Sequence, residues 1–208
     1  MPNDTTTCLL VRHGHVAGIT PPRFRGRIEF PLTSLGHRQA EALRDRVAHE
    51  WQPAAIYTSA LGRCVETGRA IGEPLGRIPQ PSEGFLDIDY GQWQGLSHEE
   101  VRTRWPDAWM CWRDQPDRAV IPDGETLEAV ATRATRALHD ILRQHPGKTV
   151  VVVAHDSVNR VLLLHALGLP LQRYWSIQQA PCTLNVLTCI ENVLAVRTLN
   201  ETGHTTGL

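Results

Sequence analysis

The sequence contains very little lysine and almost no net charge. Lys148 is the only lysine among 21 basic residues, and 22 acidic residues balance them to a formal charge of −1 at pH 7. A chain without a basic excess lacks the broad electrostatic attraction that drives binding to nucleic acids or to anionic membrane surfaces. The other basic residues are arginines, whose planar guanidinium groups make bidentate contacts with phosphate or carboxylate. We therefore expect no nucleic-acid or membrane partner. The composition is still compatible with a local anion site formed by a few arginines.

Long apolar runs and paired cysteines are also missing. No run approaches the roughly 20 residues of a transmembrane helix, and residues 1–7 lack the basic and apolar regions of a signal peptide. The five cysteines include no CxxC pair, which is typical of reduced thiols. These absences predict a cytoplasmic protein.

Short apolar runs alternate with amphipathic stretches through most of the 208 residues. This alternation predicts an α/β fold, a three-layer αβα sandwich with a mostly parallel central sheet. A final hairpin would add one antiparallel strand. The predicted strands cover residues 7–11, 54–58, 149–154, 182–190 and 192–199, and the predicted helices cover 34–50, 63–71, 97–113, 126–145 and 157–167.

No internal repeat or linker divides the chain. Residues 1–208 are therefore expected to form a single domain. Residues of about 73–125 form the longest stretch without a strong strand. We expect this stretch to be an excursion that covers one edge of the functional site.

Two of the predicted parallel strands are followed by a histidine. His13 follows the first strand together with Arg12, and His155 follows the strand at 149–154. Arg63 lies just beyond a third strand. Because sites in open α/β sheets form beyond the carboxyl ends of the strands, these imidazoles and guanidiniums are expected to converge. Such a group binds an anion and places a nucleophile beside it.

Two further patterns favour ordinary structural roles. His13 and His15 suggest a metal pair, but the binuclear pattern HxHxDH is not completed, because Gly18 stands where its last histidine belongs. The tryptophan-rich run at 105–112 is expected to pack a covering subdomain, while Trp93 suits the core or the pocket mouth equally.

Several short motifs follow one another in a specific order. Arg-His-Gly at residues 12–14 is a weak signal alone, but Ser-x-Leu-x-Arg at 59–63 and a late strand ending at His155 accompany it. In this order the sequence resembles the histidine phosphatase superfamily, in its phosphoglycerate-mutase-like branch, over about residues 7–200. Further matching segments lie at 25–26, 31–33, 36, 39–40, 67, 87–95, 122–125 and 159–160.

The resemblance implies phosphoryl transfer without a metal or another cofactor. His13 would be the nucleophile, because a neutral imidazole nitrogen can attack phosphorus and form a phosphohistidine. Its second nitrogen must then donate to an acceptor, expected to be a backbone carbonyl. Arg12, Arg63 and His155 would bind the phosphoryl oxygens, and losing one such donor typically costs roughly 10²–10³ in rate.

A general acid is implied as well. The family usually places a glutamate where this sequence has Asp87, one methylene shorter, and Asp89 is the nearest substitute. A dianionic phosphate would favour the protonated form of Asp87 by like-charge repulsion. Arg25 and Glu125 are further candidates for substrate contacts at the pocket rim.

Three positions depart from the family pattern. Ile19 stands where an asparagine often contacts phosphate, His15 where glutamate or glutamine is common, and Asp156 where the mutases commonly have glycine. These departures concern the substrate more than the chemistry.

We therefore expect a phosphatase that hydrolyses a phosphomonoester of a small metabolite through a phosphohistidine and releases inorganic phosphate. The alternatives are a cofactor-dependent phosphoglycerate mutase and a non-catalytic phosphoryl-binding module. The short chain and the Tyr-Gly-x-Trp-x-Gly segment at 90–95 favour the phosphatase. The sequence leaves open which phosphomonoester is cleaved and whether the chain forms a homodimer.

Overall fold

The computed structural model describes residues 5–208, and within them six strands form one sheet in the order β3-β2-β4-β1-β5-β6. β1, β2, β3 and β4 are parallel, whereas β5 pairs antiparallel with both of its neighbours. β5 is thus the one reversed strand of the described sheet, which confirms the expected mostly parallel arrangement. The strands are β1 (Thr6–Arg12), β2 (Ala55–Thr58), β3 (Gln80–Pro81), β4 (Thr149–Ala154), β5 (Leu184–Ile190) and β6 (Val193–Glu201).

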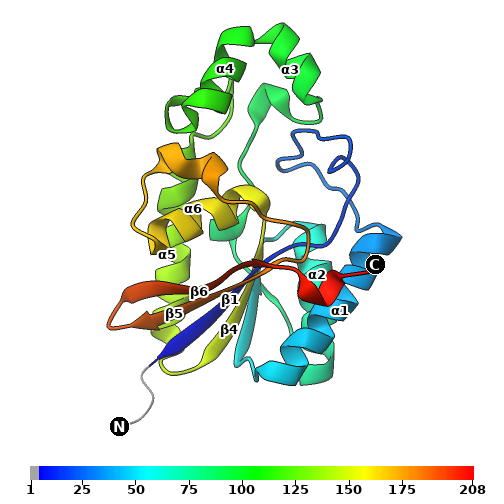
Figure 1. Ribbon diagram of the computed structural model, residues 1–208, viewed down its shortest axis with the longest axis vertical. Helices are drawn as coiled ribbons and strands as arrows, with labels where there is room; N and C mark the ends of the chain where they lie inside the picture. The colour runs from blue at the N-terminus through cyan, green and yellow to red at the C-terminus, as the bar shows by residue number, and fades with distance from the viewer. Residues whose placement is uncertain (1–4) are drawn as a thin grey trace.

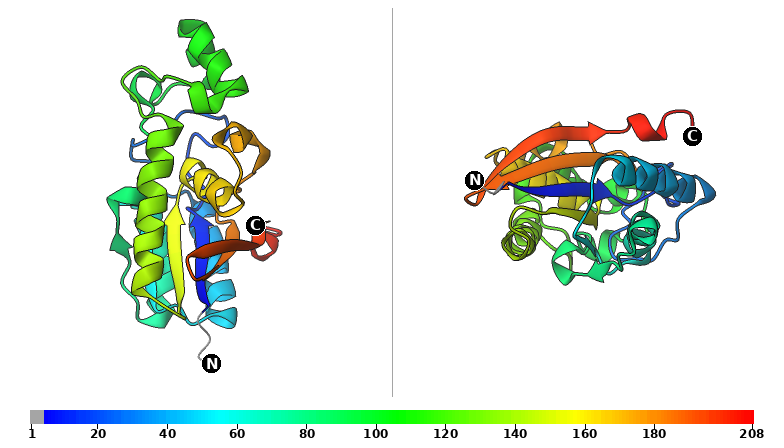
Figure 2. Two further views of the ribbon diagram at one scale, coloured as in Figure 1. Left: turned by 90° about the vertical axis from the view of Figure 1, so that its left-hand side faces the viewer. Right: turned by 90° about the horizontal axis from the view of Figure 1, so that it is seen from below.

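Helices cover both faces of this sheet, which confirms the three-layer αβα sandwich. Figures 1 and 2 show α1 and α2 on one side and α5 and α6 on the other. The helices are α1 (Ser34–Glu50), α2 (Gly62–Gly72), α3 (His98–Arg104), α4 (Pro106–Asp114), α5 (Leu127–Gln144) and α6 (Asp156–Ala166).

The sheet has a hydrophobic core on each face, and alternate residues of β1 contribute to each of them. Leu9 and Val11 pack with α1 and α2, whereas Cys8 and Leu10 pack with α5 and α6. Successive side chains of a strand point to opposite faces, so an apolar run without polar alternation is the pattern of a strand buried on both sides. The chain leaves the carboxyl end of β1 between these two cores.

The covering segment differs from expectation in one respect. The single helix predicted over 97–113 is wrong, because α3 ends before Trp105 and α4 begins at Pro106. The ring of a proline disfavours helical geometry at the preceding residue, and proline suits the first position of a new helix. Trp105 accordingly has φ −136° and ψ 64°.

The final hairpin turns where the sequence predicted. Glu191 and Asn192 link β5 to β6 with φ values of 50° and 66°. Such a pair of positive φ values matches the twist of a tight hairpin.

α3 and α4 lie beyond the carboxyl ends of β1 and β4, as Figures 1 and 2 show. The site therefore lies between the sheet and this segment. Among the described residues, no helix is both long and apolar enough to cross a membrane.

Candidate active site

His13 stands at the end of the central strand β1. Its backbone N–H donates to the Ala154 carbonyl at 3.0 Å, and its side chain is 1% exposed. The ring Nδ1 lies 2.7 Å from the Gly14 carbonyl oxygen. A carbonyl oxygen only accepts, so Nδ1 carries the proton and Nε2 keeps a lone pair for attack on phosphorus. This is the tautomer and the type of acceptor that the sequence analysis expected.

Close packing fixes the carbonyl that holds this tautomer. A Cβ atom on Gly14 would lie 2.6 Å from the Gly36 carbonyl oxygen at the start of α1, closer than real Cβ contacts. The Gly14 N–H donates to the Thr67 hydroxyl of α2 at 3.1 Å. The glycine of the Arg-His-Gly motif is therefore required by the close approach of α1.

His155 follows β4 and forms the N-cap of α6. Its ring centroid lies 5.3 Å from that of His13. Burial lowers the pKa of His13 well below its usual value near 6.5, and the neighbouring His155, Arg63 and Arg12 lower it further. Burial also lowers the pKa of His155, and the positive charges of Arg63 and Arg25 lower it further. Both imidazoles are therefore neutral near pH 7, as a nucleophile requires.

Asp87 supplies negative charge among these groups. One carboxylate oxygen accepts from the buried Arg63 at 3.2 Å and lies 3.6 Å from His155 Nδ1. The other oxygen accepts from the Ser157 hydroxyl and from the Ile88 N–H. Asp87 thus lies where a leaving group could receive a proton, next to the two predicted phosphoryl-binding side chains.

Arg63, which donates to Asp87, is also held by backbone carbonyls of another segment. It is completely buried, and it donates to the carbonyls of Gly26 at 2.6 Å and Ile28 at 2.9 Å. The segment 25–28 therefore aims the guanidinium, although only Arg25 and Gly26 in it were matched to the family pattern.

Arg12 is positioned by residues that the sequence analysis missed. Its guanidinium donates to the Gln179 carbonyl and lies 3.7 Å from Asp156. The side-chain amide of Gln179 pairs with Asn185 on β5 and accepts from Asn159 on α6. Asn159 belongs to a matched segment, but Gln179 and Asn185 carry no local signal, because their pairing depends on the sheet.

Glu125 lies in a second network, outside the cavity described below. Arg133 of α5 donates to its carboxylate at 3.0 and 2.9 Å, and Arg27 lies 3.1 Å away. Burial raises the pKa of Glu125, but hydrogen bonds from Arg133 and the Asp89 N–H outweigh it and lower the pKa overall. The structure thus places Glu125 among structural partners, and Asp89 accepts from the Gly91 N–H instead of joining the histidines.

Arg133 also holds the segment that carries the candidate acid. Its guanidinium donates to the carbonyls of Gly84 at 3.0 Å, Leu86 at 2.7 Å and Asp87 at 3.1 Å. In the sequence Arg133 appears as one charge on an amphipathic helix, so nothing local distinguishes it.

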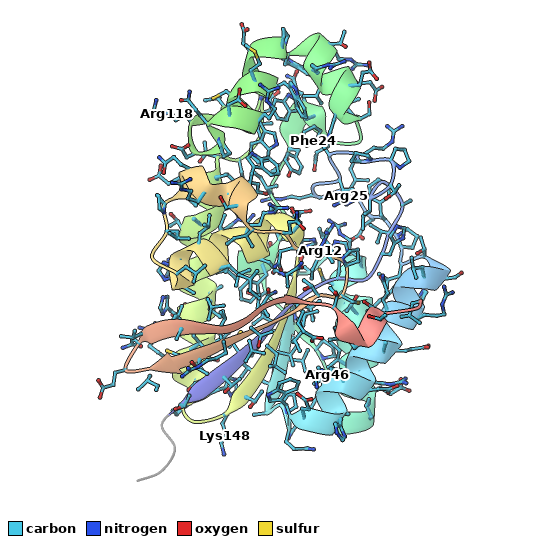
Figure 3. The ribbon with its side chains drawn as sticks, viewed as in Figure 1. Arg12, Phe24, Arg25, Arg46, Arg118 and Lys148 are labelled. Atoms are coloured by element: carbon cyan, nitrogen blue, oxygen red, sulfur yellow. The ribbon has the colours of Figure 1, made fainter. Side chains whose placement is uncertain are left out.

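A cavity of about 260 Å³ opens above these groups, and we call it the phosphoryl cavity. Arg12, Arg25 and Asp87 line it, whereas His13 and His155, which follow Arg12 and Ala154 in the chain, are buried and do not line it. Figure 3 shows Arg12, Arg25 and Phe24 in succession between the sheet and the covering segment. The other lining residues are Ile19, Pro22, Arg23, Phe24, Tyr90, His98, Trp112, Asp156, Ser157, Arg160, Tyr174 and Trp175.

Three guanidiniums at this site keep an unused donor. Within residues 5–208, the buried Nε atoms of Arg12, Arg25 and Arg63 have no hydrogen-bond partner. A buried donor without a partner costs roughly 1–3 kcal/mol, so such a cluster indicates an anion that completes it. The geometry and charge of the site match a phosphoryl group.

Two neutral imidazoles at strand ends, with arginines and a carboxylate close to them, form a site that suits phosphoryl transfer. The sequence model of the histidine phosphatase superfamily (branch 1) matches residues 8–202. The chain belongs to this family and is a phosphoric monoester hydrolase.

Known relatives agree with this assignment. Phosphoserine phosphatase 1 of Hydrogenobacter thermophilus is 29% identical over 196 residues, which cover 94% of this chain and 92% of the relative. Glucosyl-3-phosphoglycerate phosphatase of Mycolicibacterium vanbaalenii is 30% identical over 173 residues, which cover 80% of this chain and 76% of the relative. The solved structure of Bacillus stearothermophilus YhfR superposes with a TM-score of 0.91 at 28% identity, covering 96% of this chain and 99% of that one.

Proposed function

We propose that this phosphatase hydrolyses the phosphomonoester of a small metabolite by metal-independent catalysis through a phosphohistidine at His13. The observation that carries the proposal is the 2.7 Å contact between His13 Nδ1 and the Gly14 carbonyl oxygen. This contact assigns the proton to Nδ1 and leaves Nε2 nucleophilic. Arg12, Arg63 and His155 are proposed to bind the phosphoryl oxygens. Arg25, which lines the phosphoryl cavity, is proposed to contact the same group.

The first step forms the phosphohistidine. His13 Nε2 attacks phosphorus, the bond from phosphorus to the ester oxygen breaks, and protonated Asp87 gives its proton to the leaving alkoxide. In the second step Asp87 takes a proton from a water molecule, whose oxygen attacks phosphorus. The bond from phosphorus to Nε2 breaks, and inorganic phosphate leaves.

Two further aspects belong to this proposal. Residues 73–125 are proposed to cover the site, which the position of α3 and α4 beyond the strand ends supports. The protein is proposed to be cytoplasmic, which its five free cysteines support.

The test uses p-nitrophenyl phosphate in the presence of a metal chelator. Wild-type protein should turn it over, and His13→Ala should lose activity by at least about a thousandfold. The matched control is His37→Ala, which removes an exposed histidine of α1 and should retain activity. Acid quenching destroys phosphohistidine, whereas alkaline quenching during turnover should trap phosphate on residue 13 of the wild type alone.

The alternatives give different results. Equal turnover by wild type and His13→Ala would reject His13 as the nucleophile. No turnover by either protein would reject the mechanism and favour a binding module. With 3-phosphoglycerate, isomerisation that exceeds phosphate release would instead indicate a mutase.

A further inference from the structure

We propose that the alcohol part of the substrate carries a planar aromatic group, which binds in a tryptophan-lined pocket beside the phosphoryl cavity. This inference rests on the proposed function and adds a substrate class to it. The aromatic pocket has a volume of about 320 Å³ and is formed by α3, α4 and the 3₁₀ helix η5 (Leu171–Ser176). Its lining residues are His98, Trp109, Trp112, Arg113 and Trp175.

The aromatic pocket and the phosphoryl cavity are neighbours. His98, Trp112 and Trp175 line both, so shared side chains form the boundary between them. A ligand whose phosphoryl group lies at Arg12 therefore extends its alcohol part along aromatic walls. The rings that the phosphoryl cavity adds to these are Phe24, Tyr90 and Tyr174.

Trp175 presents an apolar surface rather than a polar group. Its Nε1–H donates to the Trp112 carbonyl at 3.0 Å, so its one polar atom is already used. The Arg160 guanidinium lies 5.3 Å from the ring centroid and holds the indole in place. The residue is nevertheless 44% exposed, so part of its ring is open to contact with a ligand.

The aromatic walls also form a connected group. The Trp112 ring lies 5.5 Å from Trp175 and 5.8 Å from Tyr90, and His98 lies 5.2 Å from Trp109, centroid to centroid. Rings that contact one another in this way are held in fixed orientations, so a planar ligand group is bound without much loss of side-chain freedom.

The charged groups of the phosphoryl cavity disfavour an amino-acid phosphate. An ammonium group needs a carboxylate, and Asp87 and Asp156 are the carboxylates that line this part of the described chain. The two oxygens of Asp156 already face Arg12 at 3.7 Å and Arg160 at 2.8 Å, and Asp87 is bound by Arg63. Because both carboxylates already face arginines, an ammonium group gains little here, which favours an alcohol part that is bound by the rings.

The experiment compares two esters with equivalent leaving groups. Naphthylethyl phosphate and propyl phosphate both release a primary alcohol, so the chemical step is similar, but only the first carries a planar ring system. We expect kcat/KM to be about tenfold or more higher for naphthylethyl phosphate, in line with the stacking of one ring system. Phosphoserine should be no better than propyl phosphate.

Two variants assign this preference to the pocket. Trp175→Leu keeps an apolar side chain but removes the ring, and it should lower the naphthylethyl-to-propyl ratio of kcat/KM by about tenfold. Trp51→Leu is the matched control, because Trp51 caps the far end of α1. It should retain the wild-type ratio, and thermal melting should show that both variants fold.

The outcomes separate this inference from the proposed function. A ratio near one in the wild type, or a ratio that Trp175→Leu leaves unchanged, overturns the aromatic pocket as a substrate site. If Trp175→Leu changes the oligomeric state but not the naphthylethyl-to-propyl ratio, the aromatic pocket is likewise overturned as a substrate site. That result assigns its surface to self-association. Failure to hydrolyse any ester, including p-nitrophenyl phosphate, instead rejects the phosphatase function.

Discussion

The imidazole rings of His13 and His155 lie 5.3 Å apart and are inclined by 62° to each other. The parallel pairing of β1 with β4 explains this closeness. Arg12 and Ala154 are register partners at the ends of these strands, so the residues that follow them emerge side by side. Burial lowers the pKa of both imidazoles, and the nearby His155 lowers that of His13 further, so His13 is neutral for attack.

Stability should depend on pH through these two histidines. Burial, followed by neighbouring positive groups, lowers the pKa of both residues well below 6.5. Below about pH 6.5 the unfolded chain binds protons at these positions and the folded chain does not, so stability is complete above that pH and is lost toward acid. Urea denaturation should show each histidine contributing up to about 1.4 kcal/mol per pH unit to this loss.

Substitution of one histidine isolates its contribution to the loss of stability at acid pH. His13→Gln should flatten the acid slope of the free energy of unfolding, whereas His37→Gln, at an exposed position of α1, should not. Identical slopes for wild type and His13→Gln would show that His13 titrates normally in the folded protein.

Asp87→Asn should slow poor leaving groups more than good ones. The amide keeps the shape of the side chain but cannot donate a proton to an alkoxide. We expect propyl phosphate turnover to fall by about 10²–10⁴, the usual contribution of general acid–base catalysis. Turnover of p-nitrophenyl phosphate, whose leaving group needs no proton, should fall much less, and an equal fall for both esters would remove Asp87 as the acid.

Arg133 should act on the reaction through Asp87. Loss of its donors to the Leu86 and Asp87 carbonyls frees the segment that carries the acid, so Arg133→Met should lower kcat for alkyl esters by about 10- to 100-fold with little change in KM. Arg133→Lys should recover part of this loss. Arg136→Met, an exposed change on the same helix, is the control, and an effect confined to stability would contradict a positioning role.

Asn185→Ala should weaken both the fold and anion binding. Its amide donates to the Leu10 carbonyl and pairs with Gln179, whose carbonyl holds Arg12. Leaving these buried groups unpaired should cost about 1–3 kcal/mol of stability, measured by urea denaturation. The inhibition constant of inorganic phosphate should rise as well. Thr188→Ala, on the same strand, is the control and should leave this constant unchanged. An unchanged constant in Asn185→Ala would show that the Asn185–Gln179 pair does not position Arg12 for anion binding.

The sequence predicts the part of the site that local pattern controls. Apolar runs identify β1 and β4, and parallel strands bring their carboxyl ends to one edge, so the convergence of Arg12, His13 and His155 follows from the alternation of elements. Arg63 follows by the same reasoning, because it lies just beyond a third predicted strand, and the family resemblance adds Asp87. These five predicted side chains do lie together in the structure.

The remaining partners depend on packing between distant segments. Gln179 and Asn185 are joined to Arg12 only after β5 has paired with β1, and Ser157 reaches Asp87 only across the folded site. Arg133 follows the same helical pattern as its exposed neighbour Arg136. A polar side chain that binds backbone carbonyls far away in the sequence leaves no periodic or motif signal, so these residues could not be predicted.

The position of β1 in the sheet has a consequence for biosynthesis. Its two neighbours are β4 and β5, so the first strand of the described sheet pairs only with strands that come much later in the chain. Such distant pairing is slow, because a long loop must close before any contact stabilises it. The apolar residues of β1 therefore stay without their sheet partners until β4 and β5 have been synthesised, and unpaired apolar segments of this kind are prone to aggregate. The site itself depends on this late pairing, because β4 is followed by His155, whose ring then lies beside that of His13.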